Sequence, residues 1–336
     1  MFGVVGIVGF GPSERPGDYD IAMRPGELLL IADDLTGACD AAVHFAVRGV
    51  KTVVPLLGLP FPMEACVTAF STDSRDLTES ETATRIHELS SQTPRFVFKK
   101  IDSVLRGKPG FDIAATMAAF ELARSVVTPA FPALGRRVIN GRLHVDGQTD
   151  TIDIAARLRE GGLVADVADA ASDAELDGIV AAALDLSTPL LWAGSGGLAA
   201  ALARILCGAV LPAERPEPTS VLFGIGTDHP ATTAQVAELA RRRPNAQVHQ
   251  IQRGLPPNLP MGRNLALFCS GGDTASAVLA ELAAEAIDLR GEILPGVPWG
   301  YLRGGSMDGQ PVATKSGGFG HPDTLVQVWD WFQMPG

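Results

Sequence analysis

The sequence predicts an α/β protein composed of two α/β domains with largely parallel sheets. Short apolar segments alternate with helical segments along most of the 336 residues, which is typical of parallel sheets covered by helices. A segment with three prolines, residues 211–220 (LPAERPEPTS), interrupts this alternation and has the composition of a linker. We therefore expect an N-terminal extension (1–26), a first domain (27–210), this linker and a second domain (221–336).

Apolar and β-branched runs in the first domain predict strands at 28–31, 52–56, 67–70, 96–99, 125–128 and 189–192. Helical patterns fall between them and are clearest at 79–90, 111–123, 174–184 and 198–206. A local hairpin is predicted at 137–145, because Asn140-Gly141 joins two strand-like arms. In the second domain we expect strands at 221–224 and 264–269 and helices at 232–242 and 274–285.

The composition excludes several classes of protein. The formal net charge of -11 argues against a general nucleic-acid surface, and no apolar run approaches the roughly 20 residues of a membrane span. The four cysteines lack CxxC spacing and the six histidines include no HExxH motif, so neither a zinc site nor a disulfide framework is expected. We expect a cytoplasmic protein with buried, reduced cysteines and neither a nucleic-acid nor a membrane partner.

The N-terminal residues do not fit this alternating pattern. Residues 1–12 are apolar but lack the basic start of a signal peptide, and residues 13–26 have the composition of a loose arm. Met23 stands just before the first predicted strand, and we hypothesise that it is the true initiator. A mature protein mass that includes residue 1 would contradict this. No helix follows the glycines of residues 6–11, so they form no dinucleotide-binding motif.

Two adjacent carboxylates follow the first predicted strand, in the segment LLLIADDLTGACD (28–40). Ligands bind at the carboxyl ends of strands in open α/β sheets, so Asp33 and Asp34 stand where chemistry is expected. Asp34 or Thr36 can cap the following helix, which should end at Gly49. A carboxylate here can bind a metal, hold a hydroxyl group or accept a proton. This segment alone leaves open whether both aspartates are structural or one takes part in chemistry.

The segment 97–110 (VFKKIDSVLRGKPG) contains the densest group of basic residues, namely Lys99, Lys100, Arg106 and Lys108. Fixed positive charges and forked donors suit a carboxylate or a phosphate, and a solvated surface loop is the alternative. Arg75 lies in the loop after the strand at 67–70 (FSTDSRD) and would meet Asp33 at the same sheet edge. Such a group would recognise a small polyhydroxy acid, with arginine on its carboxylate and aspartate on its hydroxyl groups.

Two glycine loops, LWAGSGGL (191–198) and FCSGGDTA (268–275), each follow a strand and precede a helix. Backbone N–H groups at such helix starts bind anions, and a tight strand-to-helix turn is the alternative. Neither loop matches GxxxxGK[ST], so neither is a Walker-type nucleotide site. Asp273 and Thr274 add a candidate Mg²⁺ or phosphate contact and a helix cap. A third segment, ATKSGGFG (313–320), sets Lys315 beside a glycine loop suited to closing over phosphates.

Together these motifs resemble the four-carbon acid sugar kinases. The segments occur in the order seen in that family across about residues 28–325, and they are ADDLTGACD, TDSR, KKIDSVLRG, PAFPALGRRVINGRLHVDG, GSGGLA, SGGDTA, GEILPGVPWG and TKSGGFG. The resemblance implies an N-terminal acid-sugar-binding domain and a C-terminal nucleotide-binding domain. It also implies that ATP phosphorylates a terminal hydroxyl group of a threonate-, erythronate- or 3-oxo-tetronate-like acid.

The resemblance assigns site residues. The expected acid-sugar contacts are Asp33, Arg75, Lys100, Ile101, Asp102 and Ser103, to which we add Arg106. The expected nucleotide contacts are Thr227, Ser270, Gly271, Gly272, Asp273, Thr274, Gly317 and Gly318, whereas the loop 194–197 is expected to be internal to its domain. The segment GIGTDHPATTAQ (224–235) departs from the family's Gly-Ser-x-Ser-x-x-Thr-x-x-Gln motif, and the chain is shorter than most relatives.

For the acid sugar, we expect Arg75 and Lys100 to hold the carboxylate and Asp33 to hold the hydroxyl groups. Asp33 or Asp102 would orient or deprotonate the attacking hydroxyl group.

For the nucleotide, we expect Mg²⁺ to bridge the ATP phosphates with Asp273 as a ligand. Lys315 would neutralise the transferred phosphate as the domains close and exclude water. Ala-rich helices also offer a surface for packing in a homodimer.

Two other functions are compatible with parts of the sequence. An Asp-nucleophile phosphatase needs an acid two residues beyond the nucleophile Asp33, where this sequence has Leu35. A non-catalytic sensor of sugar acids or nucleotides is the second alternative, because Thr227 and the missing length weaken the expected ATP site. ADP release in the presence of four-carbon acids distinguishes the kinase from the sensor.

Overall fold

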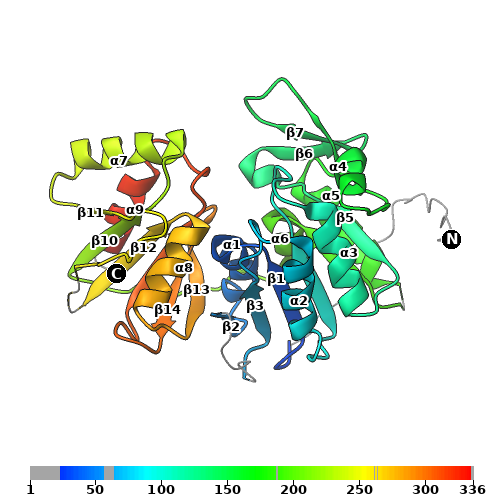
Figure 1. The fold of residues 1–336 in the computed structure, drawn as a ribbon, viewed down its shortest axis with the longest axis horizontal. Helices are drawn as coiled ribbons and strands as arrows, with labels where there is room; N and C mark the ends of the chain where they lie inside the picture. The colour runs from blue at the N-terminus through cyan, green and yellow to red at the C-terminus, as the bar shows by residue number, and fades with distance from the viewer. Residues whose placement is uncertain (1–22, 57–63, 187, 261, 263, 334–336) are drawn as a thin grey trace.

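The protein has one continuous twelve-stranded sheet and a separate three-stranded sheet. The structure is a computed structural model and describes residues 23–56, 64–186, 188–260, 262 and 264–333. Figure 1 shows two lobes side by side, the first from the N-terminal part of the chain and the second from the C-terminal part. Most of the expected N-terminal extension, residues 1–22, lies outside the described residues.

Six parallel strands form the sheet of the first lobe, in the order β2-β3-β1-β4-β9-β5. They are β1 (Leu28–Ala32), β2 (Thr52–Pro55), β3 (Val67–Ser71), β4 (Phe96–Lys100), β5 (Ser125–Thr128) and β9 (Leu191–Gly194). The helices of this lobe are α1 (Leu35–Ala46), α2 (Glu79–Leu89), α3 (Pro109–Ala119), α4 (Ile154–Glu160), α5 (Asp173–Leu184) and α6 (Gly196–Cys207). Every residue of β1, β3 and β4 is buried, as expected for strands covered on both faces.

The second lobe has four parallel strands in the order β11-β10-β12-β15, followed by two antiparallel strands, β14 and β13. The strands are β10 (Ser220–Ile225), β11 (Gln247–Gln250), β12 (Leu265–Ser270), β13 (Ala286–Leu294), β14 (Val297–Arg303) and β15 (Pro311–Lys315). Its helices are α7 (Pro230–Arg242), α8 (Gly272–Glu281) and α9 (Thr324–Gln333). The predicted class, two α/β domains with largely parallel sheets, is confirmed.

An antiparallel pair that the sequence did not predict joins the two lobes. Strand β13 pairs with β2, so that Ala286 lies opposite Pro55, and the twelve strands become one sheet. Since β13, β14 and β15 are successive antiparallel neighbours, the parallel strands of the second lobe run opposite to those of the first. Two register shifts interrupt the β13–β14 pair, and such bulges bend strands and increase their twist.

Helix α1 lies between the two lobes (Figure 1). It contacts α6 and β3 of the first lobe and β13, β14 and α8 of the second. Its sequence, LTGACDAAVHFA, consists mostly of small and apolar residues, and ten of its twelve residues are buried. A helix that is apolar on all sides is expected to be buried on all sides. Asp40 is therefore a charged residue in the interior of the molecule.

The predicted hairpin is present as β6 (Arg136–Ile139) and β7 (Arg142–Val145), which pair antiparallel. Asn140 and Gly141 have φ values of 52° and 70°, the left-handed conformation that a two-residue Asn-Gly turn requires. Strand β8 (Ile152–Asp153) completes the three-stranded sheet, and Figure 1 shows the hairpin at the top of the first lobe. The 3₁₀ helix η1 (Pro132–Leu134) leads into it.

Some element boundaries differ from the sequence prediction for local reasons. Helix α3 starts at Pro109, two residues earlier than predicted, because proline is favoured in the first turn of a helix. It ends before Glu121, whose φ of 53° is left-handed. Strand β9 is displaced by two residues, from 189–192 to Leu191–Gly194.

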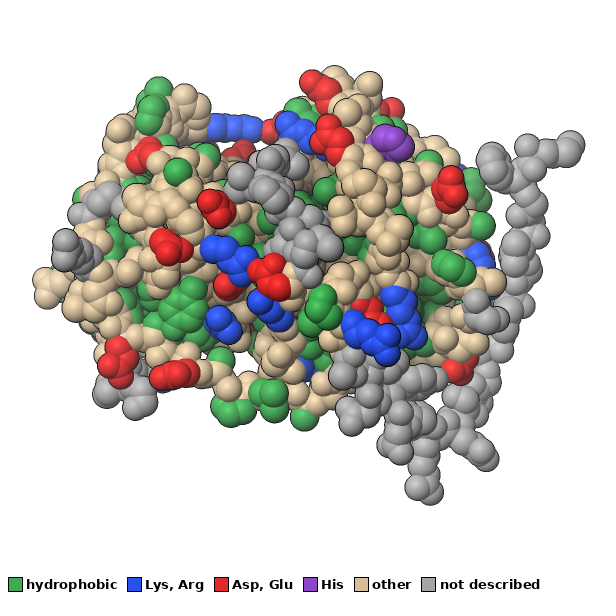
Figure 2. Space-filling model, turned by 90° about the horizontal axis from the view of Figure 1, so that it is seen from below, with side chains coloured by type: hydrophobic (Ala, Val, Ile, Leu, Met, Phe, Trp, Pro, Cys, Tyr) green, Lys and Arg blue, Asp and Glu red, His purple; other side chains and the backbone are tan. Residues whose placement is uncertain are grey.

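The surface seen from below mixes charges of both signs. Figure 2 shows Lys and Arg side chains beside Asp and Glu on this face. Among the ion pairs, Arg303 of β14 binds Glu64 at 2.8 Å and thereby connects the lobes. No helix in the described part of the chain is long and apolar enough to cross a membrane. The cysteines are free thiols, with Cys39 and Cys269 buried as predicted and the other two half-buried.

Glu292 of β13 provides a test of the hairpin that joins the lobes. Its carboxylate accepts a 2.8 Å hydrogen bond from the backbone N–H of Gly296 at the β13–β14 turn. Burial raises the pKa of Glu292 from 4.5 to about 7, against the lowering effect of Gly296. Between these pH values the folded protein holds the proton more tightly than the unfolded chain, so this group lowers stability as the pH rises.

We predict that Glu292→Gln raises the free energy of unfolding by on the order of 1 kcal/mol at pH 8 and changes it little at pH 5. The amide oxygen can still accept the hydrogen bond from Gly296 N, but the buried charge is removed. Denaturant unfolding at both pH values measures this, with the exposed Glu88→Gln as a control. Equal effects of Glu292→Gln at the two pH values would contradict a raised pKa of Glu292 in the folded protein.

Candidate functional site

The acidic turn after β1 separates the two aspartates into different roles. Asp34 is the N-cap of α1: its carboxylate accepts hydrogen bonds from Gly37 N at 2.5 Å and from Thr36 Oγ1 at 3.0 Å. Of the two residues that the sequence offered as a cap, Asp34 is the one that caps the helix, and Thr36 donates to it. Asp33 makes neither contact, and its buried carboxylate faces the loop after β3.

Arg75 brings both aspartates together. Its Nε atom donates to Asp33 Oδ2 at 2.9 Å, and its Nη2 atom lies 2.5 Å from Asp34 Oδ2. Burial alone lowers the pKa of the guanidinium, but Asp34 and Asp33 raise it above its usual value. A guanidinium has five N–H donors, so these contacts leave others for a carboxylate outside the chain. The predicted meeting of Asp33 and Arg75 at one sheet edge is therefore present.

The two lysines at the end of β4 do not form a single patch, because consecutive strand residues point to opposite faces. Lys99 is fully buried, and its Nζ atom lies 3.5 Å from Asp112 Oδ2 of α3. Lys100 points to the other face, where its Nζ atom lies 3.8 Å from Asp40 Oδ2 of α1. Of these two lysines, Lys100 is the one beside the acidic turn, 3.6 Å from the position of a Cβ atom built on Gly37.

Asp102 closes the turn that follows β4. Its Oδ1 atom accepts from the N–H groups of Val104 and Arg106 at 3.0 and 3.1 Å. Its Oδ2 atom accepts from Arg106 Nε and Nη2 at 3.0 and 2.5 Å. Although burial raises the pKa of Asp102, these bonds and the Arg106 charge hold it at about 2. Ile101 and Ser103, which flank Asp102, are buried.

The expected nucleotide residues gather at the ends of three neighbouring strands, β10, β12 and β15. Gly271 has a left-handed φ of 105°, and α8 begins after it without a side-chain cap. The first N–H groups of α8 are thus available to an anion. A Cβ atom on Gly317 would lie 2.9 Å from Thr227 Oγ1, and one on Gly226 would collide with Thr274. Only glycine permits this close approach of the three loops.

Lys315 is buried beneath the third of these loops. Its Nζ atom donates to Ser316 O at 2.8 Å, to Phe319 O at 3.1 Å and to Thr232 Oγ1 at 3.3 Å. Burial lowers its pKa from 10.5 to about 8. Gln235 of α7 donates to the same Phe319 carbonyl at 2.8 Å. In this structure the ammonium group therefore holds the shape of the 315–320 loop.

The other glycine loop, 194–197, packs against its own lobe. A Cβ atom on Gly196 would lie 2.6 Å from the ring of Phe131, and one on Gly197 would collide with the Ala130 carbonyl. Ser195 caps α6 and donates to Ala130 O at 2.8 Å. These contacts match the expectation that this loop is internal to its domain.

The two groups of loops meet although their strands run in opposite directions. A Cβ atom on Gly272 would lie 2.9 Å from Asp34 Cβ, so the start of α8 touches the acidic turn. Asp73 accepts a 3.2 Å hydrogen bond from Ser276 of α8. Arg253 binds Asp76 of the first lobe and lies 3.3 Å from Asp273 of the second. The edge of the first sheet thus faces the uncapped start of α8.

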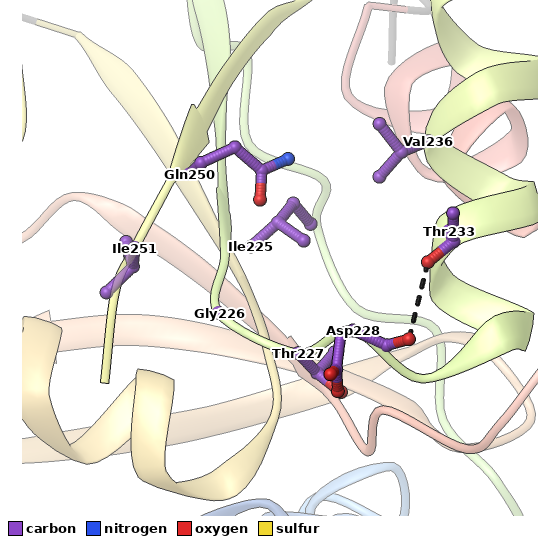
Figure 3. A pocket seen from close by; sticks show the side chains of 8 residues that line it. All are labelled: Ile225, Gly226, Thr227, Asp228, Thr233, Val236, Gln250 and Ile251. Atoms are coloured by element: carbon purple, nitrogen blue, oxygen red, sulfur yellow. Dashed lines mark hydrogen bonds between the residues drawn. The ribbon is translucent and has the colours of Figure 1, made fainter.

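A cavity of about 370 Å³ adjoins the loop after β10. Figure 3 shows Ile225 of β10, Gln250 of β11 and the next residue, Ile251, on one side and Val236 of α7 on the other, with Thr227 at its lower end. The lining combines apolar side chains with the polar Gln250, Thr233 and Asp228. Such a mixture is typical of small-molecule pockets.

The described residues contain no group of three or more His, Cys, Asp or Glu side chains that could hold a metal ion. Asp273, the expected Mg²⁺ ligand, is an exposed carboxylate in the first turn of α8. This donor set fits an ion such as Mg²⁺, which is commonly bound by one or two carboxylates together with substrate phosphates and water.

Several residues near these loops carry contacts that sequence reasoning missed. Thr232 and Gln235 hold the 315–320 loop, and both lie in the quoted segment 224–235. Asp40 lies beside Lys100 with its Oδ1 atom unpaired, and burial raises its pKa from 3.8 to about 6. Asp40 lies four residues after Thr36 on the capped helix and so on the same helix face. This spacing is the sequence signal that could have indicated its position.

Two parts of the chain match known domain families. Residues 28–157 match the sugar-binding N-terminal domain family, and residues 258–325 match the nucleotide-binding C-terminal domain family. The first match contains the loops after β1, β3 and β4, and the second contains those after β12 and β15.

Curated relatives with kinase names align along most of the chain. A D-threonate kinase of Cupriavidus necator is 30% identical over 405 residues, covering 90% of this chain and 97% of the relative. A D-threonate kinase of Salmonella typhimurium and a 3-oxo-tetronate kinase of C. necator are each 26% identical, covering 90% of this chain and 97% and 96% of the respective relatives. The alignments are longer than the 336 residues of this chain, so these relatives contain insertions.

Solved structures share the fold. A Salmonella typhimurium protein described as a putative tRNA synthase superposes with a TM-score of 0.68 at 18% identity, covering 90% of this chain and 98% of that one. A Haemophilus influenzae protein superposes with a TM-score of 0.61 at 19% identity, covering 90% of this chain and 100% of that one. These structures show the fold, and the sequence matches show that this chain belongs to the family of proteins with a sugar-binding N-terminal domain and a nucleotide-binding C-terminal domain that includes the D-threonate kinases.

Proposed function

We propose that this protein transfers the terminal phosphoryl group of ATP to a terminal hydroxyl group of a four-carbon sugar acid of the threonate, erythronate or 3-oxo-tetronate class. The observation that carries this proposal is the contact between Asp34 and Gly272, which sets a polar acid-binding edge against an uncapped helix start. The names of the kinase relatives support the same reaction and the same substrate class.

The acid sugar binds at the edge formed by the loops after β1, β3 and β4. Arg75 and Lys100 hold its carboxylate, and Asp33 holds its hydroxyl groups. Arg75 is oriented by two carboxylates, which reduces the entropy lost when it binds a ligand. Ile101 and Ser103 line the turn beside Asp102, and Arg106 acts through its bonds to Asp102.

Asp33 is the group that orients or deprotonates the attacking hydroxyl group, in preference to Asp102. All four hydrogen bonds of Asp102 come from its own turn, and its pKa of about 2 makes it a weak proton acceptor. Asp33 uses one oxygen for Arg75, which leaves the other for a substrate.

ATP binds at the ends of β10, β12 and β15. Its phosphates lie on the backbone N–H groups of 270–274 and beside Gly317 and Gly318, with Thr227 at their side and the base in the 370 Å³ cavity. Asp273 would be the protein ligand of Mg²⁺, which would supply charge neutralisation to the phosphates. Lys315 contributes to phosphoryl transfer by holding the 315–320 loop in place. To contact the transferred phosphate directly, its ammonium group would have to break one of its hydrogen bonds to the loop.

In the reaction, the substrate hydroxyl oxygen forms a bond to the γ-phosphorus. The bond from that phosphorus to the β–γ bridging oxygen breaks, and its electron pair leaves with ADP. The hydroxyl proton passes to Asp33 and then to solvent. Phosphoryl transfer depends chiefly on positioning and electrostatic stabilisation, so the contact between the lobes is expected to be essential.

We predict that Asp33→Asn lowers kcat by about 10²-fold or more, the loss expected for a general base, while ADP binding stays within threefold of the wild type. An ADP-release assay with D- and L-threonate, erythronate and their oxidised analogues measures kcat, and calorimetry measures nucleotide binding. Asp153→Asn, an exposed helix cap that asparagine can replace, is the control.

Near-normal turnover of Asp33→Asn would remove this residue from the mechanism. Saturable binding of an acid to the wild type without any ADP release would instead support a non-catalytic sensor and contradict the proposed reaction.

We predict that Lys315→Met weakens ATP binding about tenfold or more. Ser316 O and Phe319 O each keep one neutral donor but lose the charged one, and a hydrogen bond to a charged group contributes about 1.5–3 kcal/mol. Titration calorimetry with ATP and thermal unfolding measure the two effects, and the exposed Lys51→Met is the control. A variant that binds ATP normally but has a strongly reduced kcat would place Lys315 on the transferred phosphate instead.

A further inference from the structure

Arg136 lies at the start of the hairpin strand β6, and nothing in the proposed reaction yet uses it. It stands in the sequence motif PAFPALGRRVINGRLHVDG (129–147), whose structural counterpart rises at the top of the first lobe in Figure 1. Its backbone is fixed by Phe131: Arg136 N donates to Phe131 O at 3.0 Å, and Phe131 N donates to Arg136 O at 2.8 Å.

The Arg136 side chain reaches from the first lobe to the nucleotide loop of the second. Its guanidinium carbon lies 5.5 Å from the centre of the Phe319 ring. Phe319 belongs to the 315–320 loop, which Lys315, Thr232 and Gln235 hold in place. The position of Arg136 is therefore coupled to the donor site.

The same guanidinium is within electrostatic range of the acceptor site. Burial lowers the pKa of Arg136, Asp102, Asp146 and Asp40 raise it, and Arg106 lowers it. Asp102 and Asp40 stand beside the expected acid-sugar contacts. Arg136 thus contacts the nucleotide loop and lies within electrostatic range of the acid-sugar site.

Arg136 also differs from the neighbouring basic residues in its partners. Each of Arg75, Lys100 and Arg106 lies within 4.0 Å of a carboxylate. Within the described part of the chain, Arg136 has no such ion pair: its Nη1 atom donates to Leu134 O, and its buried Nε atom has no partner. A half-buried guanidinium without a carboxylate is costly unless an anion completes it.

From this geometry we propose that Arg136 is a catalytic residue, which donates hydrogen bonds to the phosphoryl group while it passes from ATP to the acid sugar. This inference rests on the proposed kinase function. The transferred group carries dispersed negative charge on its peripheral oxygens, and a planar, forked guanidinium matches that distribution better than an ammonium group. Arg136 keeps its protons throughout, so the bonds made and broken and the proton path to Asp33 stay as described above.

The next residue, Arg137, offers a matched control. It is exposed, points away from the site as neighbouring strand residues do, and binds the exposed Asp146 at 2.6 Å. Both arginines lie on the same strand and differ in their contacts. Comparing the two alanine variants therefore distinguishes an effect on the reaction from an effect on the stability of the hairpin.

The experiment measures kcat and KM for ATP and for the best acid with Arg136→Ala, Arg136→Lys and Arg137→Ala. We expect kcat to fall about 10²–10³-fold in both Arg136 variants, as when one preorganised transition-state donor is lost. Both KM values and the affinity for ADP should stay within threefold, and Arg137→Ala should match the wild type. Added guanidinium ions should partly restore kcat in Arg136→Ala and not in Arg136→Lys.

Three outcomes would overturn the inference. They are a kcat of Arg136→Ala within threefold of Arg137→Ala, a loss confined to KM, and full activity of Arg136→Lys. If Arg136→Ala does not fold, Arg136→Lys, which keeps the charge and the aliphatic stem, decides between the outcomes. A wild-type protein that phosphorylates none of the acids overturns the proposed function itself, whereas an active wild type with active Arg136 variants overturns only the inference.

Discussion

The burial of helix α1 between the two lobes is the constraint on which the rest of the structure depends. One side of the helix packs on the sheet and helices of the first lobe, and the other packs on β13, β14 and α8 of the second. Small residues are required where two lobes approach one helix, which explains the sequence LTGACDAAVHFA. The same helix begins at Asp34, which touches Gly272. The N-terminal end of α1 is therefore both a packing contact between the lobes and part of the candidate site, and a change in α1 should affect both lobes.

Much of the fold was predictable from the sequence because local signals were strong. Several parallel strands, such as β1, β10 and β12, are largely apolar runs, and the Asn140-Gly141 turn has the conformation that its residues prefer. The polar edge strand β11 (QVHQ) lacks this signal and was not predicted. The direction of the second sheet was not predictable: it follows from the antiparallel pairing of β13 with β2, which joins segments more than 200 residues apart. No local pattern encodes which edge strands of two sheets will pair.

Part of the candidate site was also predictable from the sequence, and part was not. Asp33, Arg75 and the loop at 270–274 could be found because they follow recognisable strands and occur in family motifs. Arg136 could not be assigned a role, because its importance depends on Phe319, which lies 183 residues away in the chain and belongs to the other lobe. The alternation of strand side chains also separates Lys99 from Lys100, which sequence proximity had grouped together.

These features combine into one account, in which an acid-binding edge and an anion-binding helix start are held face to face so that a phosphoryl group can pass between them. Mass spectrometry of the four-carbon acids after incubation with the protein, ATP and Mg²⁺ tests this account most directly. A phosphorylated acid should form in an amount equal to the ADP. ADP without a phosphorylated acid, or bound acid without ADP, would contradict it.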